Sequence, residues 1–252
     1  IEDDLGKSLG YREFYDKLRE GSMPSTSQIN IYTFEEKFRE LLNEGYEILY
    51  VGLSSALSGT FNSANMARNN ILEENPNAKI SVVDSLSVSM GVGMLVKKSC
   101  DMIEEGKDLE YITTWIEENK NKVIHSILVD DLKHLKRGGR ISASTAAVGS
   151  LLNIKPILKI DNNGAVEATE KIKGKKKALK YLATVVKEKA VNIKSETLYI
   201  MHGDALEEAQ ALKDIILQEL NFKEIKIQYI GTVIGSHGGP GTIATIFWGN
   251  ER

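Results

Sequence analysis

Short runs of β-branched and other apolar residues alternate along the chain with segments whose apolar residues recur every three or four positions. The first pattern predicts strands over residues 47–53, 79–83, 124–129, 155–160, 165–170, 197–201, 224–230 and 242–247. The second pattern predicts helices over residues 11–20, 33–43, 60–74, 90–105, 109–119, 143–152, 175–190 and 205–220. Because strands that alternate with helices are typical of parallel sheets, this order places the chain in the α/β class.

The order of the elements changes near residue 123, which predicts two domains. Strand–loop–helix units before that point indicate a mostly parallel three-layer α/β domain over residues 1–123. After it, strands follow one another more closely, and Asn162-Asn163-Gly164 is a strong hairpin turn signal. We therefore expect a mixed-sheet α/β domain over residues 124–252. A chain of 252 residues is long enough for two domains of ordinary size.

Composition argues against several classes of function. The 32 basic and 35 acidic residues give a net charge of −3, so no overall basic field attracts nucleic acid or an acidic membrane. The longest apolar stretch, residues 80–96, contains Asp84 and several serines, which predicts no stable membrane insertion. One cysteine and four histidines predict no disulfide, no metal site and a cytoplasmic location.

The common cofactor and catalytic motifs are absent from the sequence. It has no glycine-rich run that ends in Gly-Lys-Ser/Thr, no complete dinucleotide fingerprint and no Gly-x-Ser-x-Gly elbow. We therefore expect no cofactor.

Hydroxyl side chains gather where a predicted strand leads into a helix. They belong to Thr26 and Ser27 in one loop and to Ser54, Ser55, Ser58 and Thr60 around Gly59 in the next. Main-chain amides at a helix N-terminus bind anions together with such hydroxyl donors. Because the second loop contains no Lys or Arg, the pattern favours a carboxylate over a phosphate. The alternative is that Ser58 only caps the helix.

His237 lies in a glycine-dense segment, residues 235–241, which we expect to form a loop between two strands. A histidine displayed on such a loop favours a functional role, although a hydrogen bond to a turn carbonyl would also explain it. For His202 and Asp204 we expect structural roles, with Asp204 capping a helix.

Two basic runs have different interpretations. Residues 133–140 are interpreted as a solvated helix end, where cations are favourable. Residues 171–177 precede and open a predicted helix, where positive charge is unfavourable. This second run therefore points to an anionic ligand or partner.

Several motifs, in this order, resemble the DegV family of bacterial fatty-acid-binding proteins. They are Pro24-Ser25-Thr26-Ser27-Gln28, Ser54-Ser55-Ala56-Leu57-Ser58-Gly59-Thr60-Phe61, Val83-Asp84-Ser85 with Ser89-Met90-Gly91, residues 135–142 (LKRGGRIS), residues 151–158 (LLNIKPIL) and residues 231–241 (GTVIGSHGGPG). The resemblance extends over nearly the whole chain.

The resemblance implies a non-enzymatic carrier that binds a long-chain fatty acid, such as palmitate, stearate or oleate, between two domains. It implies that Thr26 and Ser58 hold the carboxylate and that His237 lies near it. The remaining implied ligand-binding residues are Ser27, Ser54, Ser55, Gly59, Thr60 and Gly238. The family also implies a partner, a fatty-acid kinase that phosphorylates the bound carboxylate.

The chain departs from the family pattern at two places. Family members begin with a strand that ends in an Asp-Ser turn, so the first strand unit of the N-terminal domain is expected to be missing before Ile1. Where the family often has Arg before a Lys-Lys-Ala helix, this chain has Lys173 and Lys175, which we interpret as partner-binding residues. Lysine keeps the charge but loses the bidentate geometry of arginine.

Two other functions fit parts of the pattern. A serine hydrolase of acyl esters would use Ser58 as nucleophile, His237 as base and Asp84 or Asp204 to orient the base. A domain that binds a small ketone covalently through His237 would share the general two-domain architecture, but no sequence feature demands the ketone.

Overall fold

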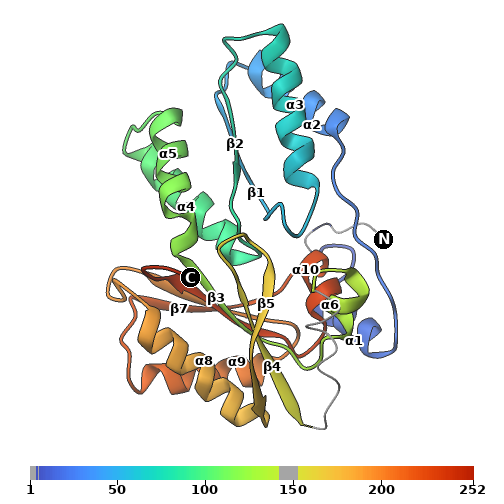
Figure 1. Cartoon of the computed structure of the whole chain (residues 1–252), viewed down its shortest axis with the longest axis vertical. Helices are drawn as coiled ribbons and strands as arrows, with labels where there is room; N and C mark the ends of the chain where they lie inside the picture. The colour runs from blue at the N-terminus through green and yellow to red at the C-terminus, as the bar shows by residue number, and fades with distance from the viewer. Residues whose placement is uncertain (1–3, 5, 142–152) are drawn as a thin grey trace. The chain divides into compact units, whose positions relative to one another are not determined.

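Two separate sheets organise the chain in the computed structural model, which describes residue 4 and residues 6–141 and 153–252 (Figure 1). One sheet is parallel and the other is mixed, as the sequence predicts. The helix expected over residues 143–152 lies outside the described residues. In the described part of the chain, no helix is both long and apolar enough to cross a membrane.

The parallel sheet pairs β1 (Ile48–Gly52) with β2 (Ile80–Asp84). On one face it packs against α2 (Ile31–Asn43) and α3 (Thr60–Glu74), and on the other against α4 (Met90–Glu104) and α5 (Leu109–Asn119). Phe34, Phe38 and Ile71 fill the first interface. Helices on both faces make this region the predicted three-layer arrangement.

The second sheet has the strand order β5-β4-β3-β8-β6-β7, and only β6 and β7 pair in parallel. The strands are β3 (Val123–Leu128), β4 (Ile154–Ile160), β5 (Val166–Lys173), β6 (Thr197–His202), β7 (Glu224–Tyr229) and β8 (Ile243–Trp248). A 3₁₀ turn, Lys120–Lys122, leads into β3. The pairings place the carboxyl ends of β3, β5, β6 and β7 on the same side of the sheet, at the ends of the strands.

Helices α8 (Lys175–Lys189) and α9 (Leu206–Leu217) cover one face of the mixed sheet (Figure 1). Their apolar sides, which include Leu182 and Leu212, pack with Phe247 of β8 in a large core cluster. The mixed-sheet unit also contains three shorter helices, α1 (Tyr11–Arg19), α6 (Lys133–Gly138) and α10 (Thr232–Gly238). Since α6 and α10 follow β3 and β7, both start at the carboxyl ends of these strands.

The chain forms two compact units that are not its two contiguous halves. The mixed-sheet unit consists of residues 1–26, 122–161 and 165–252, and the parallel-sheet unit of residues 27–121 and 162–164. The first 26 residues therefore differ from the expected division at residue 123. The reason is Tyr15 of α1, which is fully buried and donates a 2.8 Å hydrogen bond to the carbonyl of Ile230.

We expected the glycine-dense segment before β8 to form a loop. This prediction is wrong for part of the segment, because Thr232–Gly238 is the helix α10. The need for glycine at position 235 comes from tertiary packing, because a Cβ atom on Gly235 would lie 2.5 Å from the hydroxyl of Tyr15. Gly235 thus lets α1 and α10 approach closely at a position where a side chain would prevent it. His237 consequently lies in the last turn of a helix.

Candidate functional site

The serine-rich loop after β1 is held by its own hydrogen bonds. Ser54 is fully buried, and its hydroxyl donates to the carbonyl of Gly164 at 2.8 Å. The carboxylate of Asp84 accepts the main-chain N–H groups of Ser55 at 3.2 Å and Leu86 at 3.0 Å. These contacts give Ser54 and Asp84 structural partners, whereas Ser55 contributes only its main chain to them.

Ser58, Gly59 and Thr60 form the N-terminus of α3. The Ser58 hydroxyl accepts the Thr60 N–H at 3.2 Å and lies 3.0 Å from the Thr60 hydroxyl. Gly59 is the residue that precedes the helix, and a Cβ atom there would lie 2.0 Å from the Gln28 side chain. The Thr60 hydroxyl also accepts the main-chain N–H of Ile29 at 3.3 Å. Two half-buried hydroxyls therefore lie beside the first amides of a helix.

Thr26 and His237 meet although 211 positions separate them in the sequence: Thr26 Oγ1 lies 2.9 Å from His237 Nε2. Both residues are half-buried. The other ring nitrogen, Nδ1, is buried with no hydrogen-bond partner among the residues that the structure describes, and it lies against Gly138, where a Cβ atom would be 2.1 Å away. The glycine at the end of α6 thus provides the space for the imidazole ring.

His237 is neutral near pH 7. Burial lowers the pKa of its imidazole below the ordinary value, and the cations of Arg140 and Arg137 lower this pKa further. A neutral imidazole carries one N–H, so it acts toward Thr26 as either a single donor or a single acceptor. The sequence interpretation had assigned both arginines to a solvated helix end, and nothing in their spacing links them to His237.

The remaining predicted site residues divide between the two units. Ser27 is exposed and belongs to the parallel-sheet unit with Ser54, Ser55, Ser58, Gly59 and Thr60. Gly238 belongs to the mixed-sheet unit with Thr26 and His237, and its carbonyl accepts the hydroxyl of Thr242 at 2.8 Å. Within the described ranges, no cluster of three or more His, Cys, Asp or Glu residues could hold a metal ion.

The two lysines predicted to bind a partner have different surroundings. Lys175, at the start of α8, lies 2.7 Å from Glu208 and 3.7 Å from Asp130. These carboxylates offset the unfavourable position of a lysine at a helix N-terminus. Lys173 is exposed, and in the described part of the chain no ion pair engages it.

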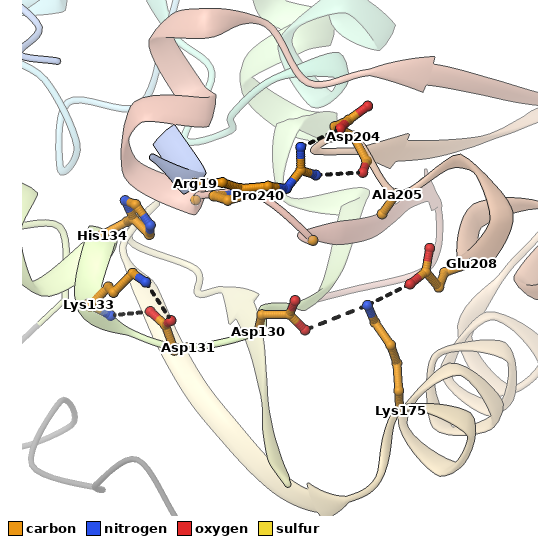
Figure 2. A pocket seen from close by; sticks show the side chains of 12 residues that line it. Arg19, Asp130, Asp131, Lys133, His134, Lys175, Asp204, Ala205, Glu208 and Pro240 are labelled. Atoms are coloured by element: carbon orange, nitrogen blue, oxygen red, sulfur yellow. Dashed lines mark hydrogen bonds and ion pairs between the residues drawn. The ribbon is translucent and has the colours of Figure 1, made fainter. Parts of the chain in front are cut away.

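A charged cavity of about 260 Å³ lies beside Lys175 in the mixed-sheet unit (Figure 2). Carboxylates that follow β3 and β6 line it together with cations, and nearly every charge is paired. Arg19 contacts Asp204 at 2.6 Å across one wall, and Lys133 contacts Asp131 at 3.3 Å across another. Sequence reasoning missed this cavity because pairing between distant segments creates it.

Comparison with known proteins places the chain in a family. The family model described as "Uncharacterised protein, DegV family COG1307" matches residues 2–249. The chain belongs to the DegV family. A DegV domain-containing protein of Clostridium perfringens is 46% identical over 250 residues, which cover 99% of this chain and 86% of the relative.

Solved structures of DegV proteins share the fold. A DegV family protein from Thermus thermophilus, described by its fatty-acid binding, has a TM-score of 0.84 and 34% identity and covers 95% of this chain and 84% of its own. A DegV protein from Eubacterium eligens, loaded with heptadecanoic acid, has a TM-score of 0.83 and 26% identity and covers 97% of this chain and 87% of its own. The predicted family and fold class are therefore confirmed.

Proposed function

We propose that this DegV protein binds a long-chain fatty acid and holds its carboxylate with neutral hydroxyl groups. The observation that carries the proposal is the hydrogen bond between Thr26 and the neutral imidazole of His237. The fatty-acid-binding relatives support the ligand class. Thr26 belongs to the mixed-sheet unit, and Ser58, the second residue proposed for this role, belongs to the parallel-sheet unit.

The neutral histidine orients the threonine. With its proton on Nε2, His237 donates to Thr26 Oγ1, which leaves the Thr26 hydroxyl proton free to donate to a carboxylate. The Nδ1 atom then carries no proton, which suits its burial without a partner, because buried acceptors tolerate this better than buried donors. Ser58 and the first amides of α3 supply further donors, and the helix dipole favours the negative charge.

The hydrocarbon tail accounts for most of the affinity. Burial contributes roughly 0.8 kcal/mol per methylene, so about fifteen methylenes contribute roughly 12 kcal/mol before costs. Lost translational and rotational freedom costs about 4 kcal/mol or more. The head-group contacts therefore need only to orient the carboxylate and offset its desolvation, which neutral donors can do.

The geometry of His237 argues against the hydrolase alternative. A triad requires an acid that orients the base, yet Nδ1 of His237 has no partner among the described residues. Asp84 binds main-chain amides, and Asp204 binds Arg19. A fluorophosphonate probe should leave Ser58 unlabelled, and labelling there would favour the hydrolase.

Denaturing mass spectrometry of protein purified from bacteria tests the ligand directly. A co-purified fatty acid supports the proposal. If none co-purifies and none displaces a fluorescent acyl probe, the proposal is wrong.

The substitution Thr26→Val tests the head-group contact, since valine keeps the shape and removes the hydroxyl. We expect palmitate to bind about tenfold more weakly, which corresponds to roughly 1.4 kcal/mol for one hydrogen bond to a charged group. The control is Thr114→Val on the exposed side of α5, which should leave the dissociation constant unchanged. Equal affinity in Thr26→Val and the wild type would contradict a carboxylate held by Thr26.

We further propose that the loaded protein presents its carboxylate to a fatty-acid kinase, with Lys173 at the contact. Lys173 supports this role because it is exposed and has no ion pair in the described part of the chain. Incubation with a purified fatty-acid kinase and ATP should yield an acyl phosphate, which hydroxylamine traps as a hydroxamate.

Lys173→Glu should slow hydroxamate formation, because it reverses the charge at the proposed contact, without changing palmitate affinity. Lys194→Glu, in the loop before β6, is the control and should react at the wild-type rate. If the loaded wild-type protein gives no hydroxamate, the kinase role is wrong although fatty-acid binding stands.

A further inference from the structure

The short helices α6 and α10 pack against each other in a reciprocal arrangement. Each helix carries one histidine and is followed by a glycine with positive φ, Gly139 after α6 and Gly239 after α10. His237 of α10 lies against Gly138 of α6, and a Cβ atom on Gly239 would lie 2.4 Å from the ring of His134 of α6. Each ring thus occupies space that a glycine on the other helix leaves open.

His134 is a buried titratable group with no part in the proposed function. It is 5% exposed, and its Nε2 atom is buried with no hydrogen-bond partner in the described part of the chain. Its Nδ1 atom lies 3.5 Å from the Arg137 guanidinium one turn along the same helix. Figure 2 places the ring at the wall of the charged cavity where α6 begins. Burial lowers the pKa of His134, so the ring is neutral near pH 7.

Contacts from α1 and α6 hold α10 in place. Arg137 donates to the carbonyl of Ser236, next to His237, at 3.3 Å. The ring of Tyr15 lies against Gly235 on the α1 side. A helix of 7 residues is too short to be stable by itself, so these contacts fix its position. At its carboxyl end, where His237 lies, the hydroxyl of Thr242 donates to the carbonyls of Gly238 and Gly239, and the His134 ring lies against Gly239.

We propose that His134 is a positioning residue that holds the last turn of α10 and thereby the hydrogen bond between His237 and Thr26. Its ring acts as a flat spacer against Gly239, so the shape of the ring matters more than its nitrogens. The consequence for ligand binding rests on the fatty-acid-binding function proposed above, whereas the effect on the His237 imidazole does not.

The test is the titration of His237 followed by NMR of the imidazole carbons, with the resonance assigned by its loss in His237→Gln. In His134→Ala, α10 loses the contact of the ring with Gly239, and we expect the pKa of His237 to rise toward the ordinary value as water reaches the ring. Palmitate should bind about tenfold more weakly in this variant, since loss of one oriented hydrogen bond has that effect. The aromatic variant His134→Phe should restore both properties.

Within the described residues, the groups that act on His237 in this titration are the cations of Arg140 and Arg137 and the hydroxyl of Thr26. None of them is substituted in the His134 variants, and the 3.5 Å contact between His134 Nδ1 and Arg137 is lost equally in His134→Ala and His134→Phe, so a difference between these two variants does not arise from it. His125→Ala is the matched control because His125 is also buried in the mixed-sheet unit, in β3. It should lower stability and leave the His237 titration unchanged.

An unchanged His237 titration in His134→Ala overturns the proposal. If that variant does not fold, His134→Phe decides: a wild-type titration supports the flat-spacer role, and a shifted one overturns it. If the wild type binds no fatty acid, the titration still tests His134, so failure of the proposed function is distinguishable from failure of this inference.

Discussion

The two units differ in the chemistry of the residues that were predicted to bind the ligand. The parallel-sheet unit offers Ser58 and Thr60 at the start of α3, and these hydroxyls stay neutral at any physiological pH. The mixed-sheet unit contains all four histidines of the sequence, including the His237 that faces Thr26. The hydroxyl groups of the parallel-sheet unit therefore keep the same protonation at every physiological pH. In the mixed-sheet unit, by contrast, the protonation of the histidines depends on pH and on their burial.

Each unit also contains one of the two tryptophans, which lets them be followed separately. Trp115 lies on α5 in the parallel-sheet unit, and Trp248 ends β8 in the mixed-sheet unit. Trp115→Phe therefore leaves a fluorescence signal from the mixed-sheet unit alone, and Trp248→Phe leaves one from the parallel-sheet unit.

The largest effect is expected for Tyr15→Ala, which tests whether α1 belongs to the mixed-sheet unit. Loss of a fully buried aromatic ring and its hydrogen bond to Ile230 should lower the free energy of unfolding by about 3–5 kcal/mol. Urea unfolding followed by Trp248 should show the loss. Tyr46→Ala, at a side chain that is 59% exposed, should change it by less than about 0.5 kcal/mol. A loss seen through Trp115 instead would assign α1 to the other unit.

An intermediate effect is expected at Gly138, which lies against the predicted site residue His237, and a comparison is offered by Gly59 in the other unit, itself a predicted site residue, which lies against Gln28. Gly138→Ala forces the ring of His237 to shift and should cost about 1–3 kcal/mol in the mixed-sheet unit. Gly59→Ala meets only the mobile end of the Gln28 side chain, at an ordinary φ of −70°, and should cost less than about 0.5 kcal/mol. Urea unfolding, followed by the tryptophan of each unit, measures the two changes in the free energy of unfolding. Equal changes for Gly138→Ala and Gly59→Ala would contradict this prediction.

The smallest effect is a dependence on pH that only the mixed-sheet unit should show. Burial lowers the pKa values of His134, His202 and His237, so below the ordinary value of about 6.5 the unfolded chain takes up more protons than the folded one. The free energy of unfolding should therefore fall from pH 7.5 to pH 5 when Trp248 reports it. Trp115 should report no such fall, and a parallel change in both signals would contradict the assignment to histidines.

Sequence patterns predicted the long elements well because their periodicity is local. The helix over residues 90–105 and the strand over 197–201 match α4 and β6 to within one residue. The α10 segment was expected to be a loop because its glycines oppose a helix locally, and its contacts with α1 and α6, such as the packing of Gly235 on Tyr15, come from distant parts of the sequence. The apolar periodicity over residues 11–20 predicted the helix α1, but it could not show that Tyr15 packs against Gly235.

The candidate site was predicted as a set of residues rather than as a geometry. The family resemblance named Thr26 and His237 together, and the structure joins them by a hydrogen bond. Their contact with a carboxylate stays a prediction. Ser54 was named for the same role, yet its hydroxyl is buried against the carbonyl of Gly164. That partner comes from a hairpin 110 positions away, so no local pattern could reveal it.

The division of the chain limits how the protein can be dissected. The chain passes from one unit to the other after residue 26, after 121, and on either side of the 162–164 turn. A fragment that ends at residue 123 would keep α1 but lack Ile230 and Gly235, against which Tyr15 packs. The complementary fragment would expose that surface and would hold the 162–164 turn without Ser54. A single proteolytic cut or gene split therefore yields two incomplete pieces, and separate expression of either unit requires joining distant parts of the sequence.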